Sequence, residues 1–414
     1  MKPKFQTTVA EEGKVTVLVP KVCFTLNYEA QALSKAPVFY NPRMEFSRDV
    51  AVVALQAYQS ILGREITICE PFTGCGIRGI RYAKEVNGVK SVTINDINSD
   101  AVKLARTNIK KNSVENRVVT IGNADANTFL ANYFAPKKRF DTIDIDPFGS
   151  PAPYIESAIM ALRDGGLIAL TATDMAPLCG IYPQACLRKY GGKPLRTEYC
   201  HELATRIILN SLVMAAARHG MGIHVLFSHS TDHYIRVYAE VKHGAKQADS
   251  ATQMIGYALH CFSCFHHEVS AGITNFLREK CSECGKTLAV AGPLWVGKLA
   301  DKEFCTRMKI ELQKKQLKTK RKLLTLLNTI SNEIDAPPLY YVIDRICDRF
   351  NLRVPSTAKI TQELENRGYK VALTHYNPKG IKTDAPATVV KEVLVLSQNK
   401  VCKNLDLKGR SPNF

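Results

Sequence analysis

Asp141-Thr-Ile-Asp-Ile-Asp-Pro-Phe-Gly-Ser-Pro151 is the stretch from which the fold can be worked out. Residues 142–145 form a short β-type run, and the proline and the Gly-Ser-Pro turn that follow cannot continue a strand. Asp146, Pro147 and Phe148 therefore fall at the carboxyl end of a predicted strand. In open α/β sheets, this end of the strands borders the ligand site.

The chemistry of these three residues suits a planar base that has an exocyclic amine. The carboxylate of Asp146 and the carbonyl of Pro147 can accept N–H groups, and Phe148 offers a flat surface for stacking. A strand that ends in an ordinary acidic turn is the alternative. The local sequence does not choose between the two interpretations.

A glycine-rich turn precedes this strand in the chain. Residues 66–70 read as a buried strand, and glycines at 74, 76 and 79 follow in a Gly-x-Gly-x-x-Gly pattern that opens a helix. Such a turn lets the backbone approach a ligand closely, and both NAD enzymes and methyltransferases have it. The Glu-Pro-Phe-Thr-Gly sequence favours a methyltransferase, whose cofactor has no pyrophosphate for the turn to hold.

Acids end the successive strands that this pattern predicts. Glu70 ends the first strand, Asp96 the second and Asp125 the third. An acid at the second position can accept both hydroxyls of a ribose, and one at the third can accept the adenine amine. Single acids at strand ends are commonly turn caps, but three in succession before Asp146 favour a cofactor site.

Strands and helical segments alternate over this part of the chain, so we predict a Rossmann-like α/β domain with a parallel sheet. Segments 224–230 and 234–242 look like antiparallel strands that close the sheet. The proline- and aromatic-rich segment 37–44, which contains Phe39, is either a core-packing loop or a cap over a bound base or adenine. A basic stretch at 188–196 is either a phosphate contact or a solvated connection.

Length, charge and cysteine content limit the class of protein. The chain has 414 residues, 45% hydrophobic residues and a net charge of +18. The length indicates two or three domains, and the charge favours a polyanionic partner. The amino terminus has no apolar signal core and no run of about 18 apolar residues occurs, so we expect a cytoplasmic protein without a membrane segment. Its 13 cysteines are then expected to be reduced.

Cys261-Phe-Ser-Cys264 and Cys281-Ser-Glu-Cys284 form two Cys-x-x-Cys knuckles. At this separation four thiolates can converge on one tetrahedral ion, which suits zinc. Disulfides and redox chemistry are the alternatives, and His260, His266 and His267 are further candidate ligands. A closed four-thiolate site leaves no open position, so we predict structural zinc without a catalytic role.

The carboxyl-terminal part is predicted from its periodicity and charge. Residues 301–327 read as one long basic helix, whose lysines either track phosphates or form a solvated face, and the net charge favours phosphates. A helix at 340–350, a second helix and a strand up to 375, and a wing at 377–383 outline a winged-helix-like module. The polar, basic tail from Gln398 is expected to fray.

Six motifs make the chain resemble the tRNA (guanine-26-N2)-dimethyltransferase family, from about residue 10 to about residue 390. The resemblance implies a Rossmann-like methyltransferase domain, S-adenosylmethionine as methyl donor, and a carboxyl-terminal domain that helps to hold tRNA. One departure is Glu70, where many members have aspartate. The motifs are Pro37-Val-Phe-Tyr-Asn-Pro-Arg-Met44, Gly76-Ile-Arg-Gly-Ile-Arg81, Asn95-Asp-Ile97, Asp146-Pro-Phe-Gly-Ser-Pro151, Thr171-Ala-Thr-Asp-Met-Ala-Pro-Leu178 and Gly380-Ile-Lys-Thr383.

The same matching implies roles for individual residues. Asp146 becomes the catalytic acid, with Pro147 beside it and with Phe39 and Phe148 as walls for the base. Glu70 is chemically able to serve in the cofactor site. The implied cofactor contacts are Arg48, Arg78, Asp96, Asp125 and Ala126.

The expected reaction is transfer of one or two methyl groups to N2 of guanosine 26 in tRNA. A methyltransferase for adenine N6 or glutamine is one alternative, since its motif uses the same chemistry. A catalytically inert, zinc-containing RNA-binding protein is another, although the intact acids at 96, 125 and 146 argue against it.

We expect a monomer without an obligate protein partner. The predicted domains are a methyltransferase domain at 1–250, a four-cysteine zinc segment at 251–292 and a tRNA-binding domain with a basic tail at 293–414.

Overall fold

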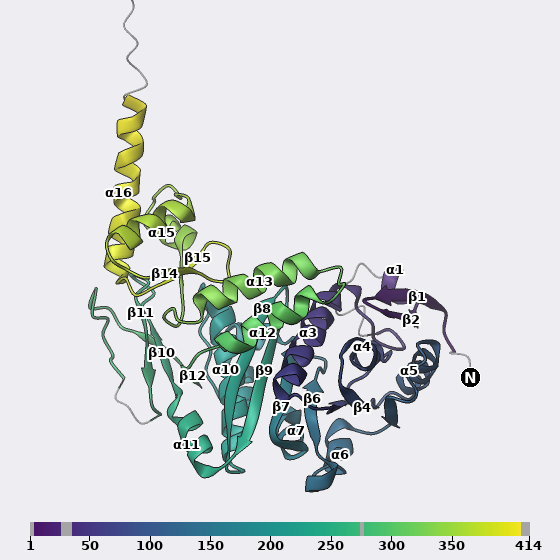
Figure 1. Cartoon of the computed structure of the whole chain (residues 1–414). Coiled ribbons are helices and arrows are strands. Elements are labelled where there is room, and N and C mark those ends of the chain that lie inside the picture. Colours follow the sequence, from purple (N-terminus) through teal and green to yellow (C-terminus); the bar gives the residue numbers. More distant parts are fainter. Residues whose placement is uncertain (1–3, 26–34, 274–276, 407–414) are drawn as a thin grey trace, which may run out of the picture.

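The computed structural model describes residues 4–25, 35–273 and 277–406 (Figure 1). At its centre is a seven-stranded sheet in the order β5-β4-β3-β6-β7-β9-β8. Strands β3 to β7 run parallel, and β9 and β8 close the sheet as antiparallel strands, which confirms the predicted Rossmann-like arrangement. The strands are β3 (Ile66–Glu70), β4 (Val89–Asn95), β5 (Val118–Gly122), β6 (Phe140–Ile145), β7 (Leu162–Ala172), β8 (Met221–Thr231) and β9 (Tyr234–His243).

Helices cover both faces of this sheet, so its strands are apolar on both sides. On β7, Leu167 and Ala169 belong to one core cluster, and the alternate residues Ile168 and Leu170 belong to another. The first face carries α3 (Glu45–Leu62), α4 (Ile77–Glu85) and α5 (Ser99–Lys111), and the second carries α6 (Ala126–Ala131), α7 (Ile155–Met160) and α10 (Cys200–Ala217). The remaining helices of this part are α8 (Met175–Leu178), α9 (Pro183–Tyr190) and α11 (Ala245–Gln253).

An amino-terminal hairpin packs against the first face. It consists of β1 (Thr7–Glu12) and β2 (Val15–Pro20), joined at Gly13, whose φ of +52° is one that glycine adopts without strain. The side chain of Asn108 on α5 accepts from the Leu18 amide at 2.7 Å and thereby ties the hairpin to the domain. A short helix, α1 (Val22–Thr25), follows.

The two cysteine knuckles extend from a separate three-stranded sheet, in the order β11-β10-β12. Apolar residues of this sheet, among them Ala258 and Leu294, share a core cluster with α10, so the sheet packs on the second face of the methyltransferase fold. Its strands are β10 (Ile255–His260), β11 (His267–Ala271) and β12 (Ala289–Trp295).

The prediction of one long helix at 301–327 was wrong. Two helices, α12 (Lys302–Gln313) and α13 (Lys320–Glu333), are separated by a turn that contains no glycine or proline. Tertiary contacts impose this turn, because Leu317 is buried in the core shared with α3 and the Lys318 ammonium donates to the carbonyl of Glu11 at 2.9 Å. Since these partners lie far away in the sequence, local periodicity could not reveal the break.

The carboxyl-terminal module has its own core and a three-stranded sheet in the order β13-β15-β14. The helix predicted at 340–350 begins only at Ile343, because Tyr341 and Val342 pair with β15. The tail expected to fray from Gln398 continues as helix to Asp406, and residues 407–414 lie outside the described residues. The elements are β13 (Tyr341–Val342), α14 (Ile343–Arg349), α15 (Thr357–Asn366), β14 (Val371–Leu373), β15 (Gly380–Thr383) and α16 (Ala387–Asp406).

None of the helices within the described residues is both long enough and apolar enough to cross a membrane.

Candidate active site

The carboxyl end of β6 presents Asp146 beside an arginine. The Arg78 guanidinium, from the first turn of α4, donates through Nη2 to Asp146 Oδ2. The Arg78 side chain is 4% exposed, whereas that of Asp146 is 21% exposed. Oδ2 of Asp146 is therefore occupied from inside the protein, and the partly exposed carboxylate still has lone pairs with which to accept from a ligand.

A buried ion-pair chain lies behind this contact, and we did not predict it from the sequence. Asp144, two residues before Asp146 and on the same side of β6, accepts from Arg236 on β9 at 2.8 and 3.0 Å. Nη1 of Arg78 lies 3.5 Å from the same carboxylate, and the hydroxyl of Tyr82 donates to it. Burial alone would raise the pKa of Asp144, but the guanidinium groups of Arg236 and Arg78 hold it below its ordinary value.

Aromatic side chains border Asp146 on its exposed side. Phe148 is 63% exposed, and its ring meets that of Phe39 edge to face, with centroids 4.5 Å apart. The segment that contains Phe39 is held over the glycine turn, since Asn98 donates to the carbonyl of Pro37 at 2.8 Å. Glycine suits position 74, because its φ is +54° and a Cβ on it would lie 3.2 Å from the Phe39 carbonyl oxygen. This position fits the cap interpretation of segment 37–44.

The ends of β4 and β5 have the hydrogen-bond acceptors and the apolar surface that an adenosine requires. Asp96 accepts from the Gly74 amide at 2.7 Å and from the Asn98 amide at 2.9 Å, and its remaining lone pairs are free for ribose hydroxyls. Ile97 is 72% exposed and offers an apolar surface to a purine. Asp125 caps α6 by accepting from two backbone amides.

The hydrogen bond from the Gly74 amide to Asp96 shows which of the two cofactor classes that share the glycine pattern fits this turn. A carboxylate, Asp96, already occupies the amide of Gly74. A pyrophosphate in the turn would meet this negative charge, so the site fits a cofactor without phosphate, such as S-adenosylmethionine, and not a dinucleotide.

Three further residues assigned to the cofactor site by resemblance are buried. Glu70 accepts from the Gly79 amide at 2.9 Å and the Thr73 hydroxyl at 2.8 Å, and burial raises its pKa to about 8. Arg48 donates through Nε to Glu12 at 2.7 Å, and Ala126 is 4% exposed at the start of α6. Glu70 and Arg48 hold the turn and the amino-terminal hairpin in place, and direct cofactor contacts from all three stay predictions.

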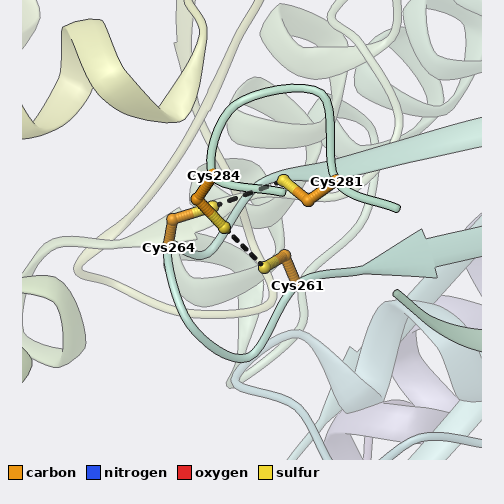
Figure 2. A group of neighbouring side chains, drawn as sticks. All are labelled: Cys261, Cys264, Cys281 and Cys284. Atoms are coloured by element: carbon orange, nitrogen blue, oxygen red, sulfur yellow. Dashed lines mark hydrogen bonds between the residues drawn. The ribbon is translucent and has the colours of Figure 1, made fainter. Parts of the chain in front are cut away.

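The four cysteines of the knuckles converge from two loops (Figure 2). Sγ of Cys261 lies 3.4 Å from that of Cys284, and Sγ of Cys264 lies 3.6 Å from that of Cys281. Thiolates bound at about 2.3 Å to a tetrahedral zinc ion are about 3.8 Å apart, so the cluster fits this ion with small adjustments.

The backbones of the two loops are alike. The amide after the second cysteine donates to the carbonyl of the first in both knuckles, at 2.9 Å for Phe265 and 3.0 Å for Gly285. Both of these residues have positive φ, of 66° and 70°. The two matching loops bring all four cysteines to one place. This arrangement favours one shared ion over disulfides, because each disulfide would join only two of the four cysteines.

A cavity of about 250 Å³ lies elsewhere, between α13, the segment after β12 and the loop before β15. None of the predicted site residues lines it, so we place the candidate active site by side-chain chemistry at the carboxyl ends of the strands.

A parallel sheet closed by an antiparallel pair, with acids at the ends of β3, β4 and β6, defines a Rossmann-like class I methyltransferase fold. The chain belongs to the N2,N2-dimethylguanosine tRNA methyltransferase family, whose model matches residues 13–395.

Individual relatives agree with this assignment. The chain is 45% identical to the tRNA (guanine(26)-N(2))-dimethyltransferase of Methanothermobacter thermautotrophicus, over 92% of this chain and 97% of that protein. It is 33% identical to the tRNA (guanine(26)-N(2)/guanine(27)-N(2))-dimethyltransferase of Aquifex aeolicus, over 91% and 93%. The structure of Trm1 from Pyrococcus horikoshii with S-adenosyl-L-methionine is similar with a TM-score of 0.81 and 33% identity, and the match covers 94% of this chain and 99% of that chain.

Proposed function

We propose that this protein is a tRNA methyltransferase that transfers methyl groups from S-adenosylmethionine to N2 of guanosine 26. The observation that carries the proposal is the partly exposed carboxylate of Asp146, held by Arg78 at the end of β6 and bordered by Phe148 and Phe39. This arrangement offers an acceptor for an exocyclic amine and a flat surface for the ring of the same base. The family to which the chain belongs and the names of its relatives support the substrate.

Residues at the ends of β4 and β5 would hold the cofactor. We assign the ribose to Asp96, the adenine to Asp125, Ala126 and the exposed Ile97, and the methionine part to the region of Arg48, Glu70 and Arg78. When bound, S-adenosylmethionine supplies an electrophilic methyl group. Exchange of the spent cofactor between rounds would allow a second methylation.

The residues around Asp146 would act mainly by positioning. The N2 amine of guanine is a weak nucleophile, because its lone pair is delocalised into the ring. The carboxylate of Asp146 and the carbonyl of Pro147 would accept the two hydrogens of this amine and direct its lone pair outward. Asp146 is also the group in reach to take the proton that the amine releases.

The base must leave its stack to reach Asp146, and the aromatic pair would hold it there. Phe148 is exposed and can stack on a purine, and Phe39 restricts the position of the Phe148 ring through their edge-to-face contact. The net charge of +18 would attract the phosphates of tRNA.

The remaining parts of the chain support this function. We propose that Cys261, Cys264, Cys281 and Cys284 hold structural zinc, and that the protein is a cytoplasmic monomer. Residues 1–250 would form the methyltransferase domain, 251–292 the zinc segment and 293–414 the tRNA-binding part. Within the last, α12 and α13 share a core with α3, and a separate core spans 341–394. The winged-helix-like module is assigned to this separate core.

Mass spectrometry of nucleosides from tRNA incubated with protein and S-adenosylmethionine tests the proposal. Wild-type protein should produce N2-methylated guanosine at position 26, and Asp146→Ala should be slower by about 100-fold or more. Asp100→Asn, a change of an exposed acid on α5, is the matched control and should match wild type.

Each contrary outcome contradicts a different part of the proposal. Retained turnover by Asp146→Ala would refute the role of this residue. Methylated adenosine in the tRNA, or transfer of labelled methyl groups to protein glutamine and not to tRNA, would contradict guanosine as the substrate. Failure to bind S-adenosylmethionine in calorimetry would indicate an inert RNA-binding protein.

A further inference from the structure

A second cluster of metal-binding side chains lies outside the knuckles. Sγ of Cys179, Sγ of Cys200 and a ring nitrogen of His201 all lie within 4.8 Å of one another. Cys179 directly follows α8, and Cys200 and His201 are the first two residues of α10. The spacing of these residues in the sequence does not indicate a site, and only the fold brings them together.

The backbones that carry these side chains are held firmly. Leu178 and Tyr199, the residues before the two cysteines, are both completely buried, with 0% exposure. Gly180 has a φ of +87°, and a Cβ on it would lie 2.8 Å from the amide nitrogen of Arg196. The loop after Cys179 therefore packs directly on the segment that leads to Cys200. Such support fixes the backbone positions from which the donor side chains extend before any ligand binds.

The donors define the chemistry of the ligand. Two thiolates and an imidazole are preferred by zinc and similar transition metals, whereas magnesium and calcium prefer oxygen. We propose that Cys179, Cys200 and His201 bind one divalent ion of the zinc class, distinct from the ion of the four-cysteine site. Three protein ligands leave a fourth position for water or another group. A Cys179–Cys200 disulfide is the competing arrangement, but both cysteines are free and a disulfide would leave His201 without a role.

The position of this cluster suggests what the ion would do. Cys179 ends the segment that follows β7, and Thr173 in the same segment exchanges two hydrogen bonds of 2.9 Å with Gly149. Gly149 belongs to the turn that begins at Asp146. An ion that joins Cys179 to α10 would therefore hold in place the segment against which this turn rests.

Zinc content of the purified full-length protein tests the proposal without reference to activity. Protein prepared with zinc and without chelators should contain about two zinc ions per chain by elemental analysis, one in each site. Cys200→Ser and His201→Gln should each lower the content to about one ion. Cys186→Ser is the matched control, because Cys186 is a completely buried free cysteine on the neighbouring α9 that belongs to neither cluster. It should retain both ions.

A zinc content that is the same in Cys200→Ser as in wild type would overturn the proposal. If the variants do not fold, X-ray absorption of the wild-type protein decides. Mixed sulfur and nitrogen ligation supports the second site, and sulfur ligation alone overturns it. A Cys179–Cys200 disulfide in peptides from protein alkylated during denaturation would also overturn it.

Discussion

Arg236 and Asp144 form a two-pronged ion pair in the interior of the sheet, and both side chains are completely buried, with 0% exposure. Arg78 lies on the other side of Asp144 and contacts Asp146 in turn. The charges alternate in sign from Arg236 on β9 to Asp144 on β6, then to Arg78 on α4 and finally to Asp146, which follows β6. A buried pair of this kind contributes geometry more than stability, since desolvation offsets most of its attraction. We therefore regard Arg236 and Asp144 as positioning residues for Asp146.

Arg236→Lys is expected to reduce methyl transfer about tenfold and to leave the dissociation constant for S-adenosylmethionine within about twofold. Lysine keeps the charge but cannot hold both oxygens of Asp144, so Arg78 and Asp146 lose their fixed orientation. Single-turnover kinetics and calorimetry measure the two quantities.

Arg163→Lys is the matched control, because Arg163 pairs with Asp141 at the opposite end of β6 and is 38% exposed. Equal losses of transfer rate in the two variants would show that the effect is general and that Arg236 does not position Asp146.

Phe39 and Phe148 are expected to act as a unit in holding the base. Phe148→Ala should raise KM for tRNA, and a double-mutant cycle with Phe39→Ala should give a coupling of about 0.5–1.5 kcal/mol for their edge-to-face contact. Steady-state kinetics with tRNA give KM for each variant, and the coupling energy is calculated from the values for wild type, the two single variants and the double variant. Purely additive effects would mean that the two rings contact the base independently or not at all.

Glu283 is expected to fix α16 to the second knuckle. Its carboxylate accepts from the Ala387 amide at 3.0 Å and from the Thr388 amide at 2.7 Å, at the start of this helix. Glu283→Ala should remove the cap and lower the local stability of α16 by about 1 kcal/mol, measured by hydrogen exchange of these two amides. Glu279→Ala, at an exposed position before the knuckle, should leave both amides protected.

The sequence was sufficient where the determining signal is local. Pro147 ends β6 and thereby places Asp146 at the end of the strand. In each knuckle, the Cys-x-x-Cys spacing places one cysteine at each end of a tight loop. The signal fails where a residue's partner is distant. Arg236 looks like an ordinary strand residue, since nothing near it in the sequence indicates that Asp144 neutralises it in the core. The turn at Leu317 is fixed by packing, and Cys179 meets Cys200 only through the docking of α8 on α10.

We expect Glu202 to make the free energy of unfolding depend on pH in the acidic range. It lies on α10, accepts from Arg206 at 2.8 Å and from the Leu339 amide at 2.9 Å, and pairs with Lys382 of β15 at 2.8 Å. Burial alone would raise its pKa, but the Lys382 ammonium and the Arg206 guanidinium lower it to about 2. The ionised carboxylate thus joins α10 of the methyltransferase fold to β15 of the carboxyl-terminal module.

The sign of the effect follows from the two states. Between pH 4.5, the ordinary pKa of glutamate, and about pH 2, the unfolded chain binds a proton at Glu202 that the folded chain does not. The free energy of unfolding should therefore fall through this window as pH decreases, by about 3 kcal/mol from this group. Glu202→Gln should be less stable at pH 7, because the buried Lys382 loses its nearer carboxylate and keeps only Glu333 at 3.8 Å. Its free energy of unfolding should have a shallower slope between pH 5 and pH 2 in urea unfolding. Glu156→Gln, a change of an acid whose side chain is 56% exposed, should keep the wild-type slope. Parallel curves for Glu202→Gln and wild type would mean that another carboxylate controls the acid sensitivity.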